Sequence, residues 1–372
     1  MSLTVGVIGG GQLARMMIAP AVELGIGLRV LADVEGASAA LAATAFGDHR
    51  DRDAVLAFAA TVDVVTFDHE HVPQELLHEL VERGVTVRPG PEALLYAQDK
   101  LLMRARLAEL GLPVPQWAAV ASVHDLGIFI GTHGGRAVVK TPRGGYDGKG
   151  VRVVGDAAEV ADWFDDDQPL LVEEVVEFRR ELSQVLARTP SGEISLWPVV
   201  ESIQREGVCA EVLAPAPHAA GRLADVAADI AISIAENLDV TGVLAVELFE
   251  TADDRLLVNE LAMRPHNSGH WTIDGSTTSQ FEQHLRAVLD LPLGATGCRD
   301  PWSVMVNVFG GVDPDQHDQR LAAAMADQPD VKLHLYGKGP RPGRKVGHVT
   351  AVGAELDDVV FRARAAAAFF ED

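Results

Sequence analysis

Cysteine and long apolar runs are scarce in this chain of 372 residues. The two cysteines, Cys209 and Cys298, lie far apart and fit neither a zinc-site spacing nor a disulfide framework. No stretch of about 18 uninterrupted apolar residues is present, and the first residues lead into an apolar segment without a basic region and cleavage site. We therefore expect a cytoplasmic protein without a membrane partner.

Positive charge is also in short supply. Lysine and arginine number 31 against 54 acidic residues, which gives a formal net charge of -23. Because nucleic-acid phosphates are bound by lysine and arginine that release counterions, this balance argues against a nucleic-acid partner. It also makes one local cluster informative, since residues 332–352 include Lys332, Lys338, Arg341, Arg344, Lys345 and His348 and no acidic side chain. Such a segment can bind small anions.

The composition is that of a folded protein, with 48% hydrophobic and 23% charged residues. A chain of this length fits two or three domains. We expect an N-terminal domain over residues 1–95, a linker helix and lid module over 96–180, a further module over 181–295, and a small strand-rich appendage over 296–372.

The first 90 residues alternate between strand and helix patterns. Apolar strand-like segments cover 3–8, 28–33, 62–67 and 85–88, and helical segments lie between them. This alternation predicts a doubly wound α/β domain. Pro20 falls inside the first helical segment and should kink it.

A glycine turn joins the first strand to the first helix. Gly9, Gly11 and Ala14 satisfy the dinucleotide fingerprint, and Asp33 ends the next strand where it could bind a ribose hydroxyl. The glycines only allow close approach of a phosphate to a helix N-terminus, so another phosphorylated ligand would fit equally. A dinucleotide, another phosphate and a purely structural turn all stay open.

A second glycine-rich stretch runs from Lys140 to Gly150. A helical segment over 92–110 and a linker at Pro113 precede it, and strands over 136–140 and 170–174 flank it. Four glycines and three cations in eleven residues favour a loop that wraps phosphates, although a solvated hairpin loop is the alternative. It is not a Walker loop, because the Gly-Lys-Ser/Thr sequence is missing.

Residues 243–261 read as a hairpin. If its turn is centred between Asp253 and Asp254, Glu247 falls opposite Glu260. Opposed side chains lie about 4.5–5.5 Å apart at Cβ, and like charges there are unfavourable unless a cation bridges them. With the Asn259 amide, the pair suits magnesium. The alternative is an edge strand whose glutamates point into solvent.

The next segment, Arg264 to His270, contains two histidines four residues apart. A zinc pair must be considered, but the Asn-Ser-Gly sequence between them favours a loop. An anion pocket made by Arg264, His266 and Asn267 fits better. The stretch from Asp68 to His71 is similarly metal-like in content, and we interpret it as an active-site loop at a strand end.

With these motifs the chain resembles the ATP-grasp superfamily and, within it, the family of 5-(carboxyamino)imidazole ribonucleotide synthases. The resemblance rests on residues 9–13, 144–150, 259–270 and 341–348 and extends over nearly the whole length. It implies a three-domain ATP-grasp architecture, α/β with α+β modules, in which ATP lies between the central and C-terminal modules. One departure is Lys100, where that family more often has arginine.

The resemblance also implies roles for individual residues. ATP as co-substrate would be held by Lys100, Lys140, Gly145, Tyr146, Asp147, Gly148, Lys149, Gly150, Glu173, Glu174, Val175, Val176, Glu181, Gln204, Asn259 and Glu260. Glu247 and Glu260 would bind Mg²⁺, with Mn²⁺ as a substitute.

The implied reaction begins when bicarbonate attacks ATP to give carboxyphosphate, oriented by Arg264, His266 and Asn267. The exocyclic amine of 5-aminoimidazole ribonucleotide then captures the carboxyl group. Tyr146 and Asp147 would act at the imidazole, and the 5'-phosphate would be bound by Gln12, Lys338, Arg344 and Lys345. A homodimer is the family expectation.

Three alternatives keep part of this pattern. A nicotinamide oxidoreductase would use the first glycine turn but gives no role to the paired glutamates. Another ATP-grasp ligase, such as a formate-using glycinamide ribonucleotide transformylase or a biotin carboxylase, would not be expected to carry the motif at 341–348. A noncatalytic nucleotide sensor would keep every binding residue and show no turnover.

Overall fold

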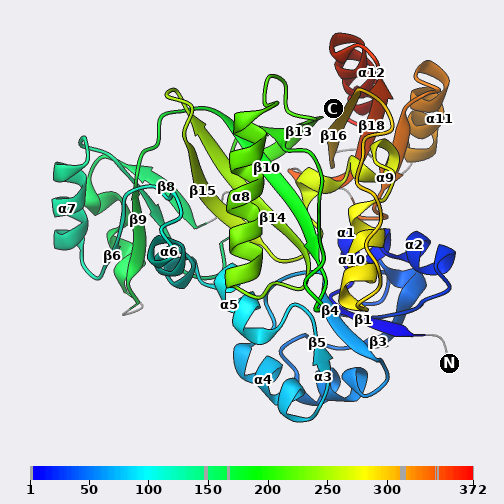
Figure 1. Ribbon diagram of the computed structural model, residues 1–372, viewed down its shortest axis with the longest axis horizontal. Helices are drawn as coiled ribbons and strands as arrows, with labels where there is room; N and C mark the ends of the chain where they lie inside the picture. Colours follow the sequence, from blue (N-terminus) through cyan, green and yellow to red (C-terminus); the bar gives the residue numbers. More distant parts are fainter. Residues whose placement is uncertain are drawn as a thin grey trace.

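The structure is a computed structural model that describes residues 3–145, 150–165, 168–310, 316–339, 341 and 343–371. Its strands form three sheets, one in each part of the molecule. In Figure 1 the N-terminal α/β domain lies below the large central sheet, and a smaller module with β6, β8 and β9 projects to the left. No helix in these residues combines the length and apolar character needed to cross a membrane.

The N-terminal domain is built on a parallel five-stranded sheet in the order β3-β2-β1-β4-β5. Its strands are β1 (Thr4–Ile8), β2 (Gly27–Ala32), β3 (Ala43–Phe46), β4 (Val64–Phe67) and β5 (Thr86–Val87). Its helices are α1 (Gln12–Met16), α2 (Ile18–Glu23), α3 (Arg52–Ala59) and α4 (Gln74–Glu82). The prediction of a doubly wound domain is confirmed, with β3 as an additional edge strand. The kink also occurs: the helix breaks at Met17, three residues before Pro20.

Two helices link this domain to the rest of the chain. They are α5 (Pro91–Gln98) and α6 (Lys100–Glu109), where the sequence pattern predicted one helix. The single-helix prediction is wrong because Asp99 has an extended backbone, and its carboxylate accepts hydrogen bonds from the N–H groups of Leu101 and Leu102. This cap starts a new helix whose first residue is Lys100.

The projecting module contains a four-stranded antiparallel sheet in the order β6-β9-β7-β8. Its strands are β6 (Trp117–Val120), β7 (Ala137–Lys140), β8 (Val151–Val154) and β9 (Leu170–Glu174). Helix α7 (Val123–Thr132) and the 3-10 segment η2 (Ala157–Phe164) pack together beside it. The predicted strands on both sides of the glycine-rich loop are therefore present.

The central sheet has nine strands, with β15 at one edge and β17 at the other. Its strands are β10 (Phe178–Arg188), β11 (Ile194–Leu196), β12 (Val200–Arg205), β13 (Val208–Ala214), β14 (Gly242–Thr251), β15 (Leu256–Ala262), β16 (Trp302–Gly310), β17 (Lys332–Leu335) and β18 (Arg344–Gly353). The helices packed around it are α8 (Arg222–Asn237), α9 (Thr272–Gly275), α10 (Gln280–Val288), α11 (His317–Asp327) and α12 (Leu356–Ala368). The C-terminal strands thus continue the sheet of the preceding module.

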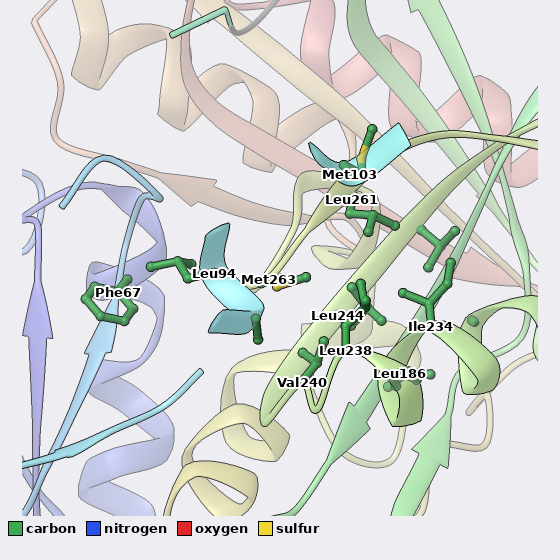
Figure 2. Packing of buried hydrophobic residues seen from close by; sticks show 14 of the residues in the cluster. Phe67, Leu94, Met103, Leu186, Ile234, Leu238, Val240, Leu244, Leu261 and Met263 are labelled. Carbon is green, nitrogen blue, oxygen red and sulfur yellow. The ribbon is translucent and has the colours of Figure 1, made fainter. Parts of the chain in front are cut away.

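One hydrophobic cluster crosses from the N-terminal domain into the central sheet. Figure 2 shows Phe67 of β4 near Leu94 of α5, with Met263 and Leu244 farther along the same cluster. Met103 of α6 also belongs to it. Because apolar burial of this kind is favourable in proportion to its area, the linker helices are fixed between the two domains. The site residues on α6 therefore have a firm support.

Candidate active site

A cavity of about 1290 Å³ lies where these parts meet. It receives residues from the N-terminal domain, the linker, the projecting module, the central sheet and the basic C-terminal segment. The predicted site residues that line it are Gln12, Lys100, Lys140, Gly145, Glu173, Glu174, Val175, Val176, Glu181, Gln204, Glu247, Asn259, Glu260, Arg264, His266, Asn267, Lys338, Arg344 and Lys345. Segments more than 300 residues apart thus contribute to one site.

The glycine-rich loop is the exception. Tyr146, Asp147, Gly148 and Lys149 lie outside the described residues. Gly150 does not line the cavity. It closes the base of the loop, where its carbonyl accepts the Thr141 N–H at 2.9 Å and its φ of +70° favours glycine.

The paired glutamates lie where the hairpin prediction puts them, but for a different reason. The turn is centred on Asp253, since Leu248 pairs with Val258 and Thr251 bonds to Arg255. Continued without interruption, that register would place Glu247 opposite Asn259. A β-bulge at Asn259 shifts the register by one residue, and Glu247 pairs with Glu260.

The charge balance of this pair favours a cation. Burial, together with Glu260 and Glu181, raises the pKa of Glu247 from 4.5 to about 8. Burial likewise raises the pKa of Glu181 to about 7. Lys100 lies 3.2 Å from Glu260 and offsets part of the negative charge. Two carboxylates facing each other in an acidic, partly buried cavity are the oxygen donors that Mg²⁺ takes, so these residues fit that ion.

Lys140 is held by a buried carboxylate. Its Nζ lies 2.7 Å from Glu173 Oε2 and donates to Asn259 Oδ1 at 3.1 Å. Arg104, which is fully buried, forms a second ion pair with Glu173. Burial opposes ionisation, but Lys140 and Arg104 lower the pKa of Glu173 below its ordinary value. The side chain of Glu173 therefore orients the lysine.

The strand end after Glu173 forms an apolar slot. The carboxylate of Glu174 at this strand end accepts the N–H of Gln116 at 2.9 Å. Beyond it Val176 lines the cavity, and the ring of Phe178 stacks on Phe249 with centroids 4.7 Å apart. A flat heterocycle fits such a slot.

The side chain of Gln280 holds the loop that runs from Arg264 to His270. The Gln280 amide accepts the His266 N–H at 2.8 Å and donates to the His266 carbonyl at 2.7 Å. Its Nε2 also lies 3.0 Å from His270 Nδ1. Burial, with Arg264 and Lys345 nearby, lowers the pKa of His266 to about 3, so this imidazole is neutral. No cluster of three metal-ligating side chains occurs among the described residues, which disfavours the zinc alternative.

The other members of this loop are also anchored. Arg264 donates from Nε to Glu70 at 2.7 Å, which brings the strand-end loop at Asp68–His71 into the site. The amide of Asn267 exchanges hydrogen bonds with Asn307 of β16 at 3.0 and 2.7 Å. The sequence predicted an active-site loop around Glu70 without a role for its side chain, and it singled out neither Gln280 nor Asn307. The partners of these three residues lie 194, 14 and 40 residues away.

The first glycine turn is occupied by the protein itself. The Asp68 carboxylate accepts hydrogen bonds from the N–H groups of Gly11 at 2.9 Å and Ala14 at 2.8 Å. A side chain at residue 11 would collide with Asp68, which explains why this position is a glycine. A dinucleotide's pyrophosphate would have to displace this anion from the helix N-terminus. The geometry therefore contradicts the nicotinamide alternative.

The basic segment reaches the same end of the cavity. Lys338 donates to the Gln12 side chain, joining the C-terminal segment to the first glycine turn. Arg341, Arg344 and Lys345 line the cavity beside it. In a chain of net charge -23, this is a local concentration of positive charge, which favours an anion.

This fold and site define an ATP-grasp enzyme. The ATP-grasp domain matches residues 105–281, the ribonucleotide synthetase preATP-grasp domain matches 1–98, and the phosphoribosylaminoimidazole carboxylase C-terminal domain matches 303–361. The N5-carboxyaminoimidazole ribonucleotide synthase of Mycobacterium tuberculosis is 51% identical over 371 residues, covering 98% of this chain and 86% of that protein. The chain therefore belongs to the N5-carboxyaminoimidazole ribonucleotide synthase family.

Two solved structures agree with this assignment. The crystal structure of the Thermus thermophilus synthetase has a TM-score of 0.89 at 37% identity and covers 99% of both chains. The Aspergillus clavatus synthase, solved in complex with ADP and 5-aminoimidazole ribonucleotide, has a TM-score of 0.89 at 32% identity and covers 100% of this chain and 99% of that one.

Proposed function

We propose that this chain is an ATP-dependent carbon–nitrogen ligase. It uses Mg-ATP and bicarbonate to carboxylate the exocyclic amine of 5-aminoimidazole ribonucleotide in de novo purine biosynthesis. The products are 5-(carboxyamino)imidazole ribonucleotide, ADP and phosphate. The observation that carries the proposal is one cavity with two charged ends: the glutamate pair with Lys100 and Lys140 at one, and the basic group around Lys338 at the other.

The nucleotide end supplies electrostatic clamping. Lys100 and Lys140 bind the ATP phosphates. Glu247 and Glu260 would hold Mg²⁺, which would neutralise charge developing on the transferred phosphoryl group. The apolar slot at Val176 and Phe178 receives the adenine. These groups do little covalent chemistry; they hold the γ-phosphate in line with the attacking oxygen.

Bicarbonate would bind beside Arg264, His266 and Asn267, which line the same cavity. One of its oxygens attacks the γ-phosphorus, the bond to the ADP oxygen breaks, and carboxyphosphate forms. The amine nitrogen then attacks the carboxyl carbon, phosphate leaves, and the amine loses a proton. Arg264 supplies positive charge for the bicarbonate, whereas neutral His266 and Asn267 supply hydrogen bonds. The proposed binders of the ribonucleotide 5'-phosphate are Gln12, Lys338, Arg344 and Lys345.

The test is ADP release in the presence of Mg-ATP, with bicarbonate and 5-aminoimidazole ribonucleotide added separately and together. We expect the full mixture to stimulate release strongly. Stimulation by glycinamide ribonucleotide with formate, or no stimulation at all, would refute the proposal in favour of another ligase or a nucleotide sensor. Glu260→Gln should abolish release while circular dichroism stays unchanged. Exposed Glu236→Gln on α8 is the matched control and should keep full activity.

Three finer features belong to the same proposal. Mn²⁺ should replace Mg²⁺ in the assay, because both accept carboxylate oxygens. A homodimer is expected from the family and would be measured by analytical ultracentrifugation. A cytoplasmic location is expected for the metabolic role and would be measured by cell fractionation.

A further inference from the structure

We infer that Arg104 is a positioning residue that sets the register of the metal-binding hairpin and thereby the affinity for Mg²⁺ and ATP. The inference rests on the proposed function of the glutamate pair. Arg104 lies on α6 and is fully buried, and it lines neither the cavity nor the protein surface. Its effect on the site must therefore pass through the groups that it contacts.

The first of these groups is the β-bulge. On the turn side of the hairpin, Leu248 pairs with Val258; one step further, Glu247 pairs with Glu260, so Asn259 is the extra residue. Without the bulge Glu247 would face Asn259, and Glu260 would move to the opposite face of the sheet, because side chains alternate along a strand. The shared face of the two carboxylates depends on this one residue.

Arg104 binds the bulge through both arms of its guanidinium. Nη1 donates to the Val258 carbonyl at 2.6 Å and Nη2 to the Asn259 carbonyl at 2.9 Å. β15 is the edge strand of its sheet, so these carbonyls have no further strand to pair with. The N–H of Val258 bonds to Pro113 at 2.8 Å on the same edge. Buried carbonyls need such partners, and a planar fork serves two at once where an ammonium group serves them less well.

The same guanidinium reaches the phosphate-binding lysine. Arg104 pairs with Glu173, Glu173 Oε2 lies 2.7 Å from Lys140 Nζ, and Lys140 donates to Asn259 Oδ1 at 3.1 Å. These four side chains and the bulge backbone form a closed ring. The ring joins α6, β9, β7 and β15, which belong to the linker, the projecting module and the central sheet. The buried guanidinium of Arg104 therefore orients both Lys140 and the pair of Glu247 and Glu260.

The experiment compares Arg104→Lys and Arg104→Met with Arg88→Met. Arg88 is a matched control, since its side chain also bonds from one domain to another. It donates to the Val288 carbonyl at 2.7 Å, and neither residue lines the cavity. Binding of Mn²⁺ in the presence of ADP is measured by electron paramagnetic resonance, beside the KM values for ATP and 5-aminoimidazole ribonucleotide. Arg104→Lys keeps the charge beside Glu173 and loses the fork, so it tests the bulge contact with the least disturbance.

We expect both Arg104 variants to weaken Mn²⁺ binding by about tenfold or more, the range seen when partners of metal ligands are removed. In the same variants the KM for ATP should rise, while the KM for 5-aminoimidazole ribonucleotide should stay within about twofold of the wild-type value. Arg88→Met should bind Mn²⁺ as tightly as the wild type. Wild-type Mn²⁺ affinity in a folded Arg104 variant would overturn the inference. Failure of both variants to fold would also overturn it, because the role would then be structural. Failure of the proposed function would instead appear in the wild-type protein, as ADP release that the ribonucleotide does not stimulate.

Discussion

Replacing Glu247 with glutamine should make the metal-free protein more stable while removing its activity. Glu247 faces Glu260 in a partly buried site, and burial and this neighbour raise its pKa from 4.5 to about 8. At neutral pH, Glu247 in the folded protein therefore either holds a proton that the unfolded chain would release, or it is ionised and its negative charge faces that of Glu260. Glutamine has nearly the same shape and no charge, and its amide can donate to Glu260.

The size of the effect follows from this pKa. An acid whose folded pKa is raised loses folding stability as pH rises from its unfolded value toward its folded value. From 4.5 to pH 7 the difference is about 2.5 pH units, each worth about 1.36 kcal/mol, so the upper limit is about 3 kcal/mol. The side chain is 23% exposed and Lys100 lies nearby, so about 1–2 kcal/mol is the expected gain for Glu247→Gln at pH 7.

The assay is thermal unfolding of both proteins with a chelator present, at several values between pH 5 and pH 8. The variant should melt a few degrees higher at pH 7, and its advantage should be small at pH 5, grow with pH and level off near pH 8. With Mg²⁺ and ATP added, only the wild type should gain stability, because binding stabilises the folded state. A variant that is less stable than the wild type at pH 7, or an advantage independent of pH, would refute the reasoning.

Three other substitutions test separate parts of the site. Asp68→Ala removes the carboxylate that caps α1 and should cost about 1 kcal/mol in thermal unfolding. Asp68→Asn keeps only one of the two accepting oxygens, so it should retain only part of this stability. NADH binding to the wild-type protein, measured by fluorescence, should be absent; tight binding would revive the dinucleotide interpretation. Gln280→Leu removes the support of His266 and should raise the KM for bicarbonate about tenfold or more, with the KM for ATP as the internal control. Lys338→Met breaks the contact with Gln12 and should raise the KM for 5-aminoimidazole ribonucleotide by a similar factor; an unchanged value would remove Lys338 from the phosphate site.

The sequence by itself determined the local elements and the kinds of side chain at the site. Alternating apolar segments predicted the parallel N-terminal sheet, and Pro20 predicted the break between α1 and α2. Glycines and lysines marked the loop at 140–150, and the two apolar segments on either side of Asp253 predicted the hairpin that carries Glu247 and Glu260. Such features depend on residues close together in the chain, where periodicity and turn chemistry act directly.

Only the tertiary structure decided how these pieces become a site. The turn is centred on Asp253, so spacing alone would have misplaced Glu260; a bulge at Asn259 restores the pair, and Arg104 binds the bulge from another element. Asp68 fills the helix N-terminus that the glycine fingerprint left open to a dinucleotide. In each case the deciding partner is a buried polar group from a distant part of the chain. Buried donors and acceptors must be paired, but sequence spacing does not show which of them will meet.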